Sequence, residues 1–593
     1  MMMSNLHPAF ILFVGAFLPL VFKGKARNWV MLAVALVTFG VTVSLPFGDS
    51  LSASWMGFEL DLLRVDALSR TFAIIFTLSL VAAYIYAMYL DEAVPYIASS
   101  IYVGSALGAV FAGDLISLYM FWEIMAVSST FLILIRRRKG SARSASRYVL
   151  IHLMGGLILL AGVLMTCVTT GTTAFDAAIM DPRTPASWLI LVGILINAAA
   201  PPLSAWLSDS YPEATVFGGI ILSAYTTKTA VYTLLRGFPG WEILIVVGCV
   251  MAIYGIIYAL LENDMRRILA YSIINQVGFM VCAAGIGTEM AINGAVAHAF
   301  CHIIYKALLW MSAGAVLYRT GTEKCTELGG LYKSMPTTMV LGTIGALAIS
   351  SVPGTSGFTS KTMILVAAAD QHLFWPWMIL EIASAGVFLH AGIKFPYFVF
   401  FDKDRGLRPK RALPSMTLGM GLLAFLCLFL GVYPKPLYDL LPYQQMFLDG
   451  FSVFHAEKLV TQFQMLLFSG LVFFMFLPLL KRTATISLDT DWIYRKVVYR
   501  SMVSLARVLN GTNARAYALF AQKLPHVLFH FFNHGPSRLV VFVLTPFWQI
   551  QGLDWQEIAY RQRLMYRRAS LGIYPVGLAA IFVAIFFGLL YLT

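Results

Sequence analysis

The chain has 593 residues, of which 59% are hydrophobic and only 12% are charged, and its formal net charge is +13. A typical soluble domain carries about 25% charged residues, so this composition excludes an ordinary soluble protein. In a membrane protein, basic residues gathered in loops report orientation, so the positive charge does not indicate a nucleic-acid partner.

Apolar runs of about 20 residues recur along nearly the whole chain, and each can cross about 30 Å of hydrocarbon. A transmembrane barrel would show alternating segments of about ten residues instead. Residues 1–8 lack the basic stretch of a signal peptide, so we expect the first span to start at Ala9 or nearby. The sequence predicts an all-α polytopic membrane protein of about sixteen spans, at residues 8–22, 28–47, 68–90, 95–112, 114–135, 148–170, 187–207, 215–236, 241–261, 267–287, 291–318, 337–352, 374–401, 413–433, 459–480 and 571–592.

Two predicted spans contain helix-breaking sequences at related places. The seventh holds Asn197 followed by Pro201 and Pro202, and the twelfth ends in the Pro- and Gly-containing stretch 350–357. Proline removes a backbone donor and clashes with the preceding turn, and a break in the membrane survives only where protein or water satisfies the freed groups. Each break falls in the fourth span of a five-span block, which predicts two inverted five-helix repeats.

The stretch that precedes the last span differs from the rest of the chain. It is basic, rich in aromatic side chains and interrupted by prolines. Basic amphipathic helices lie along the membrane interface; a poorly ordered loop is the alternative, which the bulky apolar content disfavours. The expected parts are N-terminal transmembrane helices at 1–94, the first repeat at 95–236, the second repeat at 241–402, C-terminal transmembrane helices at 413–480, a lateral segment at 481–570 and a final transmembrane helix at 571–593.

The distribution of loop cations predicts how the chain is oriented. If the N-terminus lies outside, the loops after odd-numbered spans lie inside, and these loops hold most of the Lys and Arg residues. Cytoplasmic loops carry such an excess, although the acidic loop 91–96 does not follow the trend. We therefore expect both termini outside, the lateral segment in the cytoplasm and the spans in contact with lipid.

Four ionisable side chains lie within predicted spans, flanked by apolar residues: Glu123, Lys228, Lys306 and Lys394. A charge near the bilayer centre costs roughly 2.5–3.5 kcal/mol on insertion scales, so such residues pair or meet water and mark ion or proton pathways. Glu123 lies about nine residues into a span that begins near Asp114, and Lys228 is its natural partner if their helices face each other. A static pair that only joins two helices is the alternative.

His298, His302 and Lys306 follow one another at intervals of four residues, so they stack on one helix face. Histidine titrates near neutral pH, and lysine follows when it is desolvated, so this stripe predicts a route for protons. A zinc site is the alternative, because two histidines four residues apart can bind metal. No carboxylate or thiolate is placed to complete such a site, and we expect neither a metal nor a cofactor.

His390 and Lys394 repeat the four-residue spacing in the thirteenth predicted span. Lys394 lies near the inner end of that span, so a side chain that extends to the membrane surface is the alternative to a pathway role. Lys361, which follows the second break, either caps backbone groups freed there or lines an exit.

Seven short motifs resemble the antiporter-like subunits shared by Mrp-type cation/proton antiporters and respiratory complex I, most of all the D-type member of Mrp complexes. Any one motif is weak, but the ordered set over residues 60–435 is specific. The motifs are Arg64–Ser69, Gly113–Glu123, Pro201–Leu207 with Tyr211–Ala214, Thr227–Tyr232, Leu269–Ser272, Lys306–Leu309 and Ser356–Lys361.

The resemblance implies two inverted five-helix repeats, a hetero-oligomeric complex in a bacterial plasma (inner) membrane, and a midplane proton path through Glu123, Lys228, Lys306 and Lys394. The chain departs from the family at Asn197, where many members have a lysine that pairs with the glutamate. Its tail also resembles the lateral-helix extension of the largest antiporter-like subunit of complex I.

These observations predict a proton-conducting subunit of a multisubunit cation/proton antiporter, with Na⁺ as the expected cation. The first alternative is a proton-pumping, non-redox subunit of a redox-driven complex of the complex I or membrane-hydrogenase type. The second is an assembly scaffold or anion-uptake partner that has no flux of its own. The partners expected are other membrane subunits, protons, a monovalent cation and lipid.

Overall fold

The computed structural model describes residues 6–55, 57–180, 184–479, 483, 489–490, 492–569 and 574–592. It is mostly helical and forms two compact units, Met1–Asp491 and Trp492–Thr593. The described residues leave out parts of two predicted segments. These parts are residues 481, 482, 484–488, 491 and 570 of the lateral segment and residues 571–573 of the final span.

Twelve helices of the described chain are long and apolar enough to cross a membrane, so this is a multi-pass membrane protein. One of them, Ile493–Ile550, lies in the predicted lateral segment. The count of sixteen spans stays a prediction. The shorter apolar helices are Pro8–Val21, Pro185–Asn197, Pro336–Ile349 and Ala580–Tyr591.

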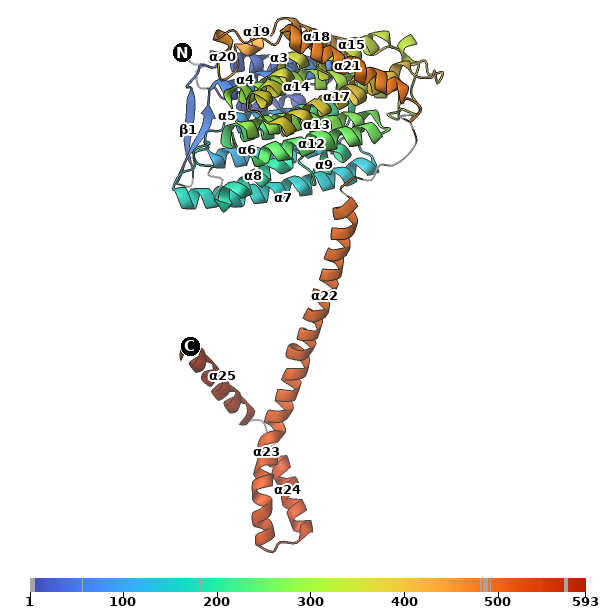
Figure 1. The fold of residues 1–593 in the computed structure, drawn as a ribbon. Coiled ribbons are helices and arrows are strands. Elements are labelled where there is room, and N and C mark those ends of the chain that lie inside the picture. The colour runs from blue at the N-terminus through green and yellow to red at the C-terminus, as the bar shows by residue number, and fades with distance from the viewer. Residues whose placement is uncertain are drawn as a thin grey trace. The chain divides into compact units, whose positions relative to one another are not determined.

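A two-stranded antiparallel hairpin departs from the all-α prediction; Figure 1 shows it at one end of the helix bundle. A hairpin alone is marginally stable. Here the Asp61 N–H donates to the Asp114 carboxylate at 2.8 Å, and Arg64 pairs with Asp176 at 3.3 Å. These tertiary bonds hold strands that the helix-based analysis missed. The first elements are α1 (Pro8–Gly15), α2 (Leu18–Val21), α3 (Gly24–Ser44), β1 (Ser50–Trp55), β2 (Phe58–Arg64), α4 (Ala67–Tyr86) and η1 (Ala87–Tyr89).

The next seven helices include the first of the two breaks that the sequence predicts. The chain leaves the helical conformation after Asn197, with Ala199 at φ 62°, and becomes helical again at Ala205. An interruption that was not predicted, at Tyr225, divides the predicted span 215–236 into two helices. The helices are α5 (Val94–Phe111), α6 (Leu115–Leu134), α7 (Lys139–Thr170), α8 (Pro185–Asn197), α9 (Ala205–Ser210), α10 (Val216–Ala224) and α11 (Thr226–Gly237).

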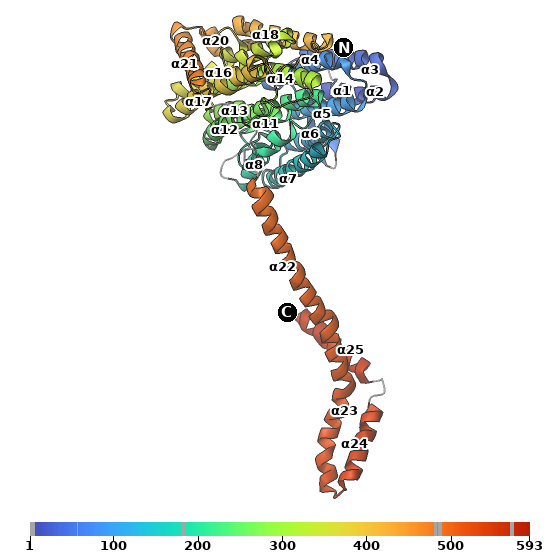
Figure 2. The same ribbon diagram turned by 90° about the vertical axis from the view of Figure 1, so that its right-hand side faces the viewer.

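The next part of the chain contains α14, which runs through the interior of the bundle in Figures 1 and 2. The chain is again non-helical between Ile349 and Ser356, the second predicted break. The elements are α12 (Ile243–Leu261), α13 (Met265–Ile286), α14 (Glu289–Thr320), η2 (Leu331–Lys333), α15 (Pro336–Ile349), α16 (Ser356–Asp370), α17 (Phe374–Val387) and the π-helical segments η3 (Phe388–Lys394) and η4 (Tyr397–Phe401).

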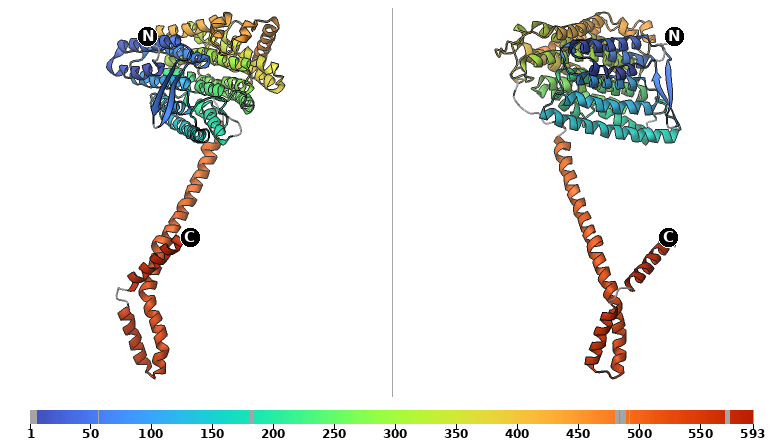
Figure 3. Two further views of the ribbon diagram at one scale, coloured as in Figure 1. Left: turned by 90° about the vertical axis from the view of Figure 1, so that its left-hand side faces the viewer. Right: turned by 180° about the vertical axis from the view of Figure 1, so that it is seen from behind.

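Four helices complete the first unit: α18 (Pro414–Val432), α19 (Lys435–Tyr438), α20 (Gln445–Leu448) and α21 (Ala456–Met475). In the second unit, α23 and α24 pack side by side around a turn with Gly552 at φ 73° (Figure 3). That unit contains η5 (Ile493–Val498), α22 (Tyr499–Tyr517), η6 (Ala518–Lys523), α23 (Leu524–Ile550), α24 (Trp555–Ala569) and α25 (Tyr574–Leu592).

Candidate functional site

The predicted stripe on α14 is completely buried. His298, His302 and Lys306 are each 0% exposed, and the ring centroids of the two histidines are 6.3 Å apart. The burial follows from the position of α14, which α13, α15, α16, α18, α10 and α4 contact on different sides. Three titratable side chains therefore share one face of a helix that the rest of the bundle encloses.

His298 has a partner on each ring nitrogen. Its Nδ1 lies 3.1 Å from Ser360 Oγ, and its Nε2 lies 3.1 Å from Gln276 Oε1. The Gln276 oxygen can only accept, so Nε2 carries the hydrogen. Tyr305 donates to the same oxygen at 3.2 Å. His298 is thus held in one tautomer by α13 and α16.

His302 and Lys306 differ from His298, because neither His302 ring nitrogen nor Lys306 Nζ has a hydrogen-bond partner among the described residues. Leaving a buried polar group without a partner costs about 1–3 kcal/mol, and more if the group is charged. Buried polar groups are satisfied in most native structures, so each exception calls for an explanation, and a role in moving charge is one.

The other three lysines each bind the carboxyl-terminal end of a helix. Lys228 Nζ donates to Ser223 O of α10 at 2.6 Å, and Lys361 Nζ donates to Ile349 O of α15 at 3.3 Å. Lys394 Nζ donates to three carbonyls at the end of α12. A cation is stabilised there by the helix dipole. Lys394 is 0% exposed, so its amine binds these carbonyls inside the protein and not in water at the membrane surface.

Electrostatic interactions join these groups into a row. The charge of Lys306 interacts with that of Lys228 on one side. On the other side, His390 interacts with Lys306, Lys361 and Lys394. His390 Nδ1 also lies 2.8 Å from Gly386 O, while its Nε2 has no partner in the described part of the chain. The row runs from Lys228 through α14 to Lys394.

Glu123 lies outside this row. Its Oε1 is buried without a hydrogen-bond partner among the described residues, and it lies against α7, where a Cβ added to Gly156 would be 1.8 Å from that oxygen. Lys228 is directed instead to Ser223 and Thr227. Among the described residues no ion pair joins Glu123 to Lys228. The expected pairing is therefore not formed in this structure.

Two supporting residues have clear structural positions. Asp114 is the N-cap of α6, where its Oδ1 accepts from the N–H groups of Ile116 and Ser117 at 2.9 and 2.8 Å. Asn197 is the last residue of α8 and is 0% exposed, and neither atom of its amide has a partner in the described structure. Pro201 and Pro202 lie in the non-helical segment that follows.

His152 of α7 was not among the predicted site residues. Its ring is 1% exposed and lies between Tyr148 and Trp206, with centroid distances of 4.1 and 4.4 Å. Neither ring nitrogen has a hydrogen-bond partner within the described chain. The signal was present, because His152 is an ionisable residue inside the predicted span 148–170.

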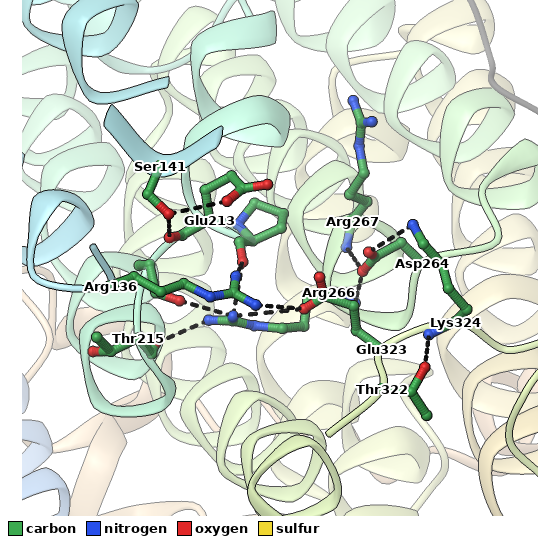
Figure 4. A network of polar contacts seen from close by, with 12 residues as sticks. Arg136, Ser141, Glu213, Thr215, Asp264, Arg266, Arg267, Thr322, Glu323 and Lys324 are labelled. Carbon is green, nitrogen blue, oxygen red and sulfur yellow. Dashed lines mark hydrogen bonds and ion pairs between the residues drawn. The ribbon is translucent and has the colours of Figure 1, made fainter. Parts of the chain in front are cut away.

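A buried arginine fixes the connection between α9 and α10, as Figure 4 shows. Arg266 is 0% exposed and donates to Pro212 O at 2.7 Å, Ala214 O at 2.9 Å and Thr215 O at 3.0 Å. Arg136 reaches Pro212 O and pairs with Glu323 at 3.2 Å. The sequence analysis used these cations only as signs of orientation, whereas the structure gives them a role in packing.

The described residues contain no group of three His, Cys, Asp or Glu side chains that could hold a metal ion. The arrangement instead provides buried cationic and imidazole groups in sequence, each near enough to influence the next. Such an arrangement can accept and release protons.

Curated relatives belong to cation/proton antiporters. The chain is 29% identical to the A/B component of a probable K(+)/H(+) antiporter of Rhizobium meliloti, over 73% of this chain and 47% of that protein. It is 34% identical to the D component of the Na(+)/H(+) antiporter of Alkalihalophilus pseudofirmus, over 44% of this chain and 56% of that protein. The chain thus spans about half the length of these relatives. These relatives include both A-type and D-type components, so the comparison does not assign the chain to the D type over the A type.

Two solved structures share the fold. The structure of the Mrp complex from Dietzia sp. DQ12-45-1b has a chain with a TM-score of 0.65 at 20% identity, covering 75% of this chain and 98% of that one. The membrane-bound sulfane sulfur reductase, an archaeal respiratory membrane complex, gives a TM-score of 0.73 at 22% identity, covering 88% and 99%.

Residues 112–386 match the family model described as NADH:quinone oxidoreductase/Mrp antiporter, TM. This range contains the first helix break, the second break and all of α14. This part of the membrane core is therefore similar to the NADH:quinone oxidoreductase/Mrp antiporter transmembrane family.

Proposed function

We propose that this chain is the proton-conducting membrane subunit of a multisubunit cation/proton antiporter of the Mrp type. The observation that carries the proposal is the buried row that includes His302 and Lys306, whose nitrogens have no hydrogen-bond partner among the described residues. Relatives named as components of Na⁺/H⁺ and K⁺/H⁺ antiporters support it.

Protons move between the two ends of this row through Lys228, His298, His302, Lys306, His390 and Lys394, with water between them. Like charges in a low-dielectric interior raise each other's energy. A proton that arrives on Lys306 therefore makes a charge on Lys228 less favourable, and it acts in the same way on the His390 side. Repulsion between neighbours thus couples the arrival of one charge to the release of the next.

The two halves of the membrane core are proposed to be inverted five-helix repeats, 95–236 and 241–402, within about sixteen spans. Three correspondences support this. Asp114 and Asp264 each cap the next helix and form an isolated bridge, to Ala174 and Lys324. The helices that follow, α7 and α14, both have 32 residues. In each half, a non-helical segment follows the next apolar helix.

The remaining domain boundaries and the orientation belong to the same proposal. The chain lies in a bacterial plasma membrane with both termini outside, and residues 481–570 lie along the cytoplasmic interface. Exposed aromatic and aliphatic side chains along α22 and α23, together with their basic residues, support an interfacial position.

The partners proposed are the other subunits of a hetero-oligomeric antiporter, and the exchanged ions are protons and Na⁺ or K⁺. The relatives' names support these ions. A redox-driven proton pump is the second candidate, because the matching family model covers NADH:quinone oxidoreductase as well. Purification from the native membrane separates the two, since redox subunits with cofactors accompany only the second.

The proposed function is tested with the whole complex reconstituted in proteoliposomes. Lys306→Met removes the titratable amine and keeps an apolar side chain of similar length. We expect cation-driven proton flux to fall by roughly 10²-fold, the usual size for loss of a proton-transfer group. Lys458→Met, on the partly exposed start of α21, is the control and keeps wild-type flux. Unchanged flux in Lys306→Met would show that the row does not conduct.

A further inference from the structure

The first half of the membrane core holds a second buried histidine site that the row above does not include. His152 and His302 occupy the same place, each being the fourteenth residue of a 32-residue helix. Both are buried, and none of their ring nitrogens has a hydrogen-bond partner in the described structure. The two histidines therefore share their position in the helix, their burial and their lack of hydrogen-bond partners.

Four residues further along, the two helices differ in a way that explains where Glu123 lies. α14 has Lys306 at that position, whereas α7 has Gly156. The Glu123 carboxylate occupies the room left at Gly156, because a Cβ there would be 1.8 Å from Oε1. Residues 152 and 156 are one helical turn apart, about 6 Å along the axis. A carboxylate from α6 thus lies about one helical turn along α7 from His152, at the position where the other half has a lysine.

The surroundings of His152 contribute no competing charge among the described residues. The elements packed against this part of α7 are α6, α8 and α9. They bring Glu123, the Asn197 amide adjacent to the ring and the Trp206 ring. The nearest charged pair towards the start of α7 is Arg147 with Asp209, at 3.2 Å. The Asn197 amide carries N–H groups but does not titrate near neutral pH, so His152 is the titratable side chain here that can take a proton from Glu123.

We propose that His152 is the proton-exchange partner of Glu123 in the first half of the membrane core. The proton leaves the Glu123 carboxyl oxygen, which becomes a carboxylate, and binds a ring nitrogen of His152, which becomes an imidazolium. No other bond changes. The Trp206 ring, whose centroid lies 4.4 Å from that of the His152 ring, positions it. Trp206 is itself fixed by its Nε1–H, which donates to Ile196 O at 2.9 Å.

This inference rests on the proposed function, and its test uses the same reconstituted complex. His152→Gln keeps hydrogen-bonding capacity and removes titration; Gly156→Ala displaces the Glu123 carboxylate without changing the ring. Both are expected to lower proton flux by roughly 10²-fold while assembly and melting temperature stay near wild type. The controls are His372→Gln, in an exposed turn, and Gly40→Ala, where a Cβ would meet nothing within 4 Å.

A spectroscopic readout separates proton exchange from a packing role. Infrared difference spectra after a pH jump identify the Glu123 carboxyl band by its loss in Glu123→Gln. We expect His152→Gln to shift the pH at which that band appears. Wild-type flux with an unshifted band in His152→Gln would overturn the proposal; if that variant fails to assemble, wild-type flux in Gly156→Ala overturns it.

The two proposals can fail separately. If the wild-type complex exchanges no cation for protons, the proposed function is wrong, while a shifted carboxyl band still supports the Glu123–His152 pair. If the wild type exchanges ions and both variants match it, the pair is wrong and the proposed function stands.

Discussion

Lys394 donates a hydrogen bond from Nζ to the carbonyl oxygen of Ala259 at 2.6 Å, and it reaches Leu260 O and Glu262 O at 2.7 and 2.9 Å. One buried ammonium therefore satisfies three carbonyls at the end of α12. The π-helical segment η3 carries this lysine, and π-helical turns occur often at functional sites.

The contact predicts that Lys394 contributes to stability as well as to transport. Lys394→Met leaves the carbonyls of α12 without their cation, and we expect it to lower the free energy of unfolding by about 1–3 kcal/mol. Lys394→Arg keeps a charge and recovers part of that loss, but it holds its proton permanently and does not restore flux. Thermal melting and proteoliposome flux measure the two effects. Recovered flux in Lys394→Arg would contradict a titrating role.

Asp66 and Arg236 predict a pH-dependent tie between α4 and α11. Arg236 Nη2 lies 2.8 and 2.7 Å from the two carboxylate oxygens, and Asp66 also accepts from Ser69 N–H as the cap of α4. Burial raises the pKa of Asp66, but Arg236 and the Ser69 N–H together lower it below the ordinary value of aspartate. The Asp66–Arg236 ion pair therefore stabilises the protein above pH of about 4. This stabilisation is lost as the pH falls through the lowered pKa that Asp66 has in the folded state.

Two substitutions separate the charge of Asp66 from its capping role. Asp66→Asn keeps the cap and loses the charge, so its stability should fall less than that of the wild type as the pH drops in this range. Asp66→Ala loses both, and we expect a further cost of about 0.5–2 kcal/mol. Melting temperatures between pH of about 3 and 7 measure both effects, since this range brackets the aspartate pKa. Equal acid sensitivity in wild type and Asp66→Asn would contradict the assignment.

Arg266 predicts a requirement for a guanidinium at the connection between α9 and α10. It bonds Pro212 O, Ala214 O and Thr215 O together and lies 5.1 Å from the Trp310 ring. Arg266→Lys keeps the charge but loses the planar guanidinium that binds several carbonyls at once. We therefore expect the free energy of unfolding to fall by about 1–3 kcal/mol. Arg137→Lys, with a 75% exposed side chain, is the matched control and leaves the melting temperature unchanged.

Asp489 predicts that the chain after α21 docks on the first helix break. It is 8% exposed, accepts from Tyr271 O–H at 2.6 Å and from Tyr254 O–H, and its neighbour Thr490 donates to Pro202 O at 3.2 Å. We expect Asp489→Ala to release this contact and to raise hydrogen–deuterium exchange in residues 198–204. Asp449→Ala, in an exposed turn, should leave that exchange unchanged. Unaltered exchange in Asp489→Ala would show that the contact does not constrain the break.

The sequence by itself determined that this is a multi-pass membrane protein, where two of its helices break, and which buried ionisable groups lie on α14. Those conclusions follow from local rules: apolar length, proline and the four-residue period of a helix. The spacing placed His298, His302 and Lys306 on one face, and the structure places them there.

Only the tertiary structure decided which groups face one another. Glu123 and Lys228 belong to helices far apart in sequence, and no local pattern states which way each side chain turns when its helix packs. The room at Gly156 accommodates the Glu123 carboxylate against α7, whereas the carbonyl of Ser223 at the end of α10 binds Lys228. The β1–β2 hairpin escaped prediction for the same reason, since bonds to Asp114 and Asp176 hold it. Contacts between distant segments depend on packing in three dimensions, which local sequence patterns do not specify.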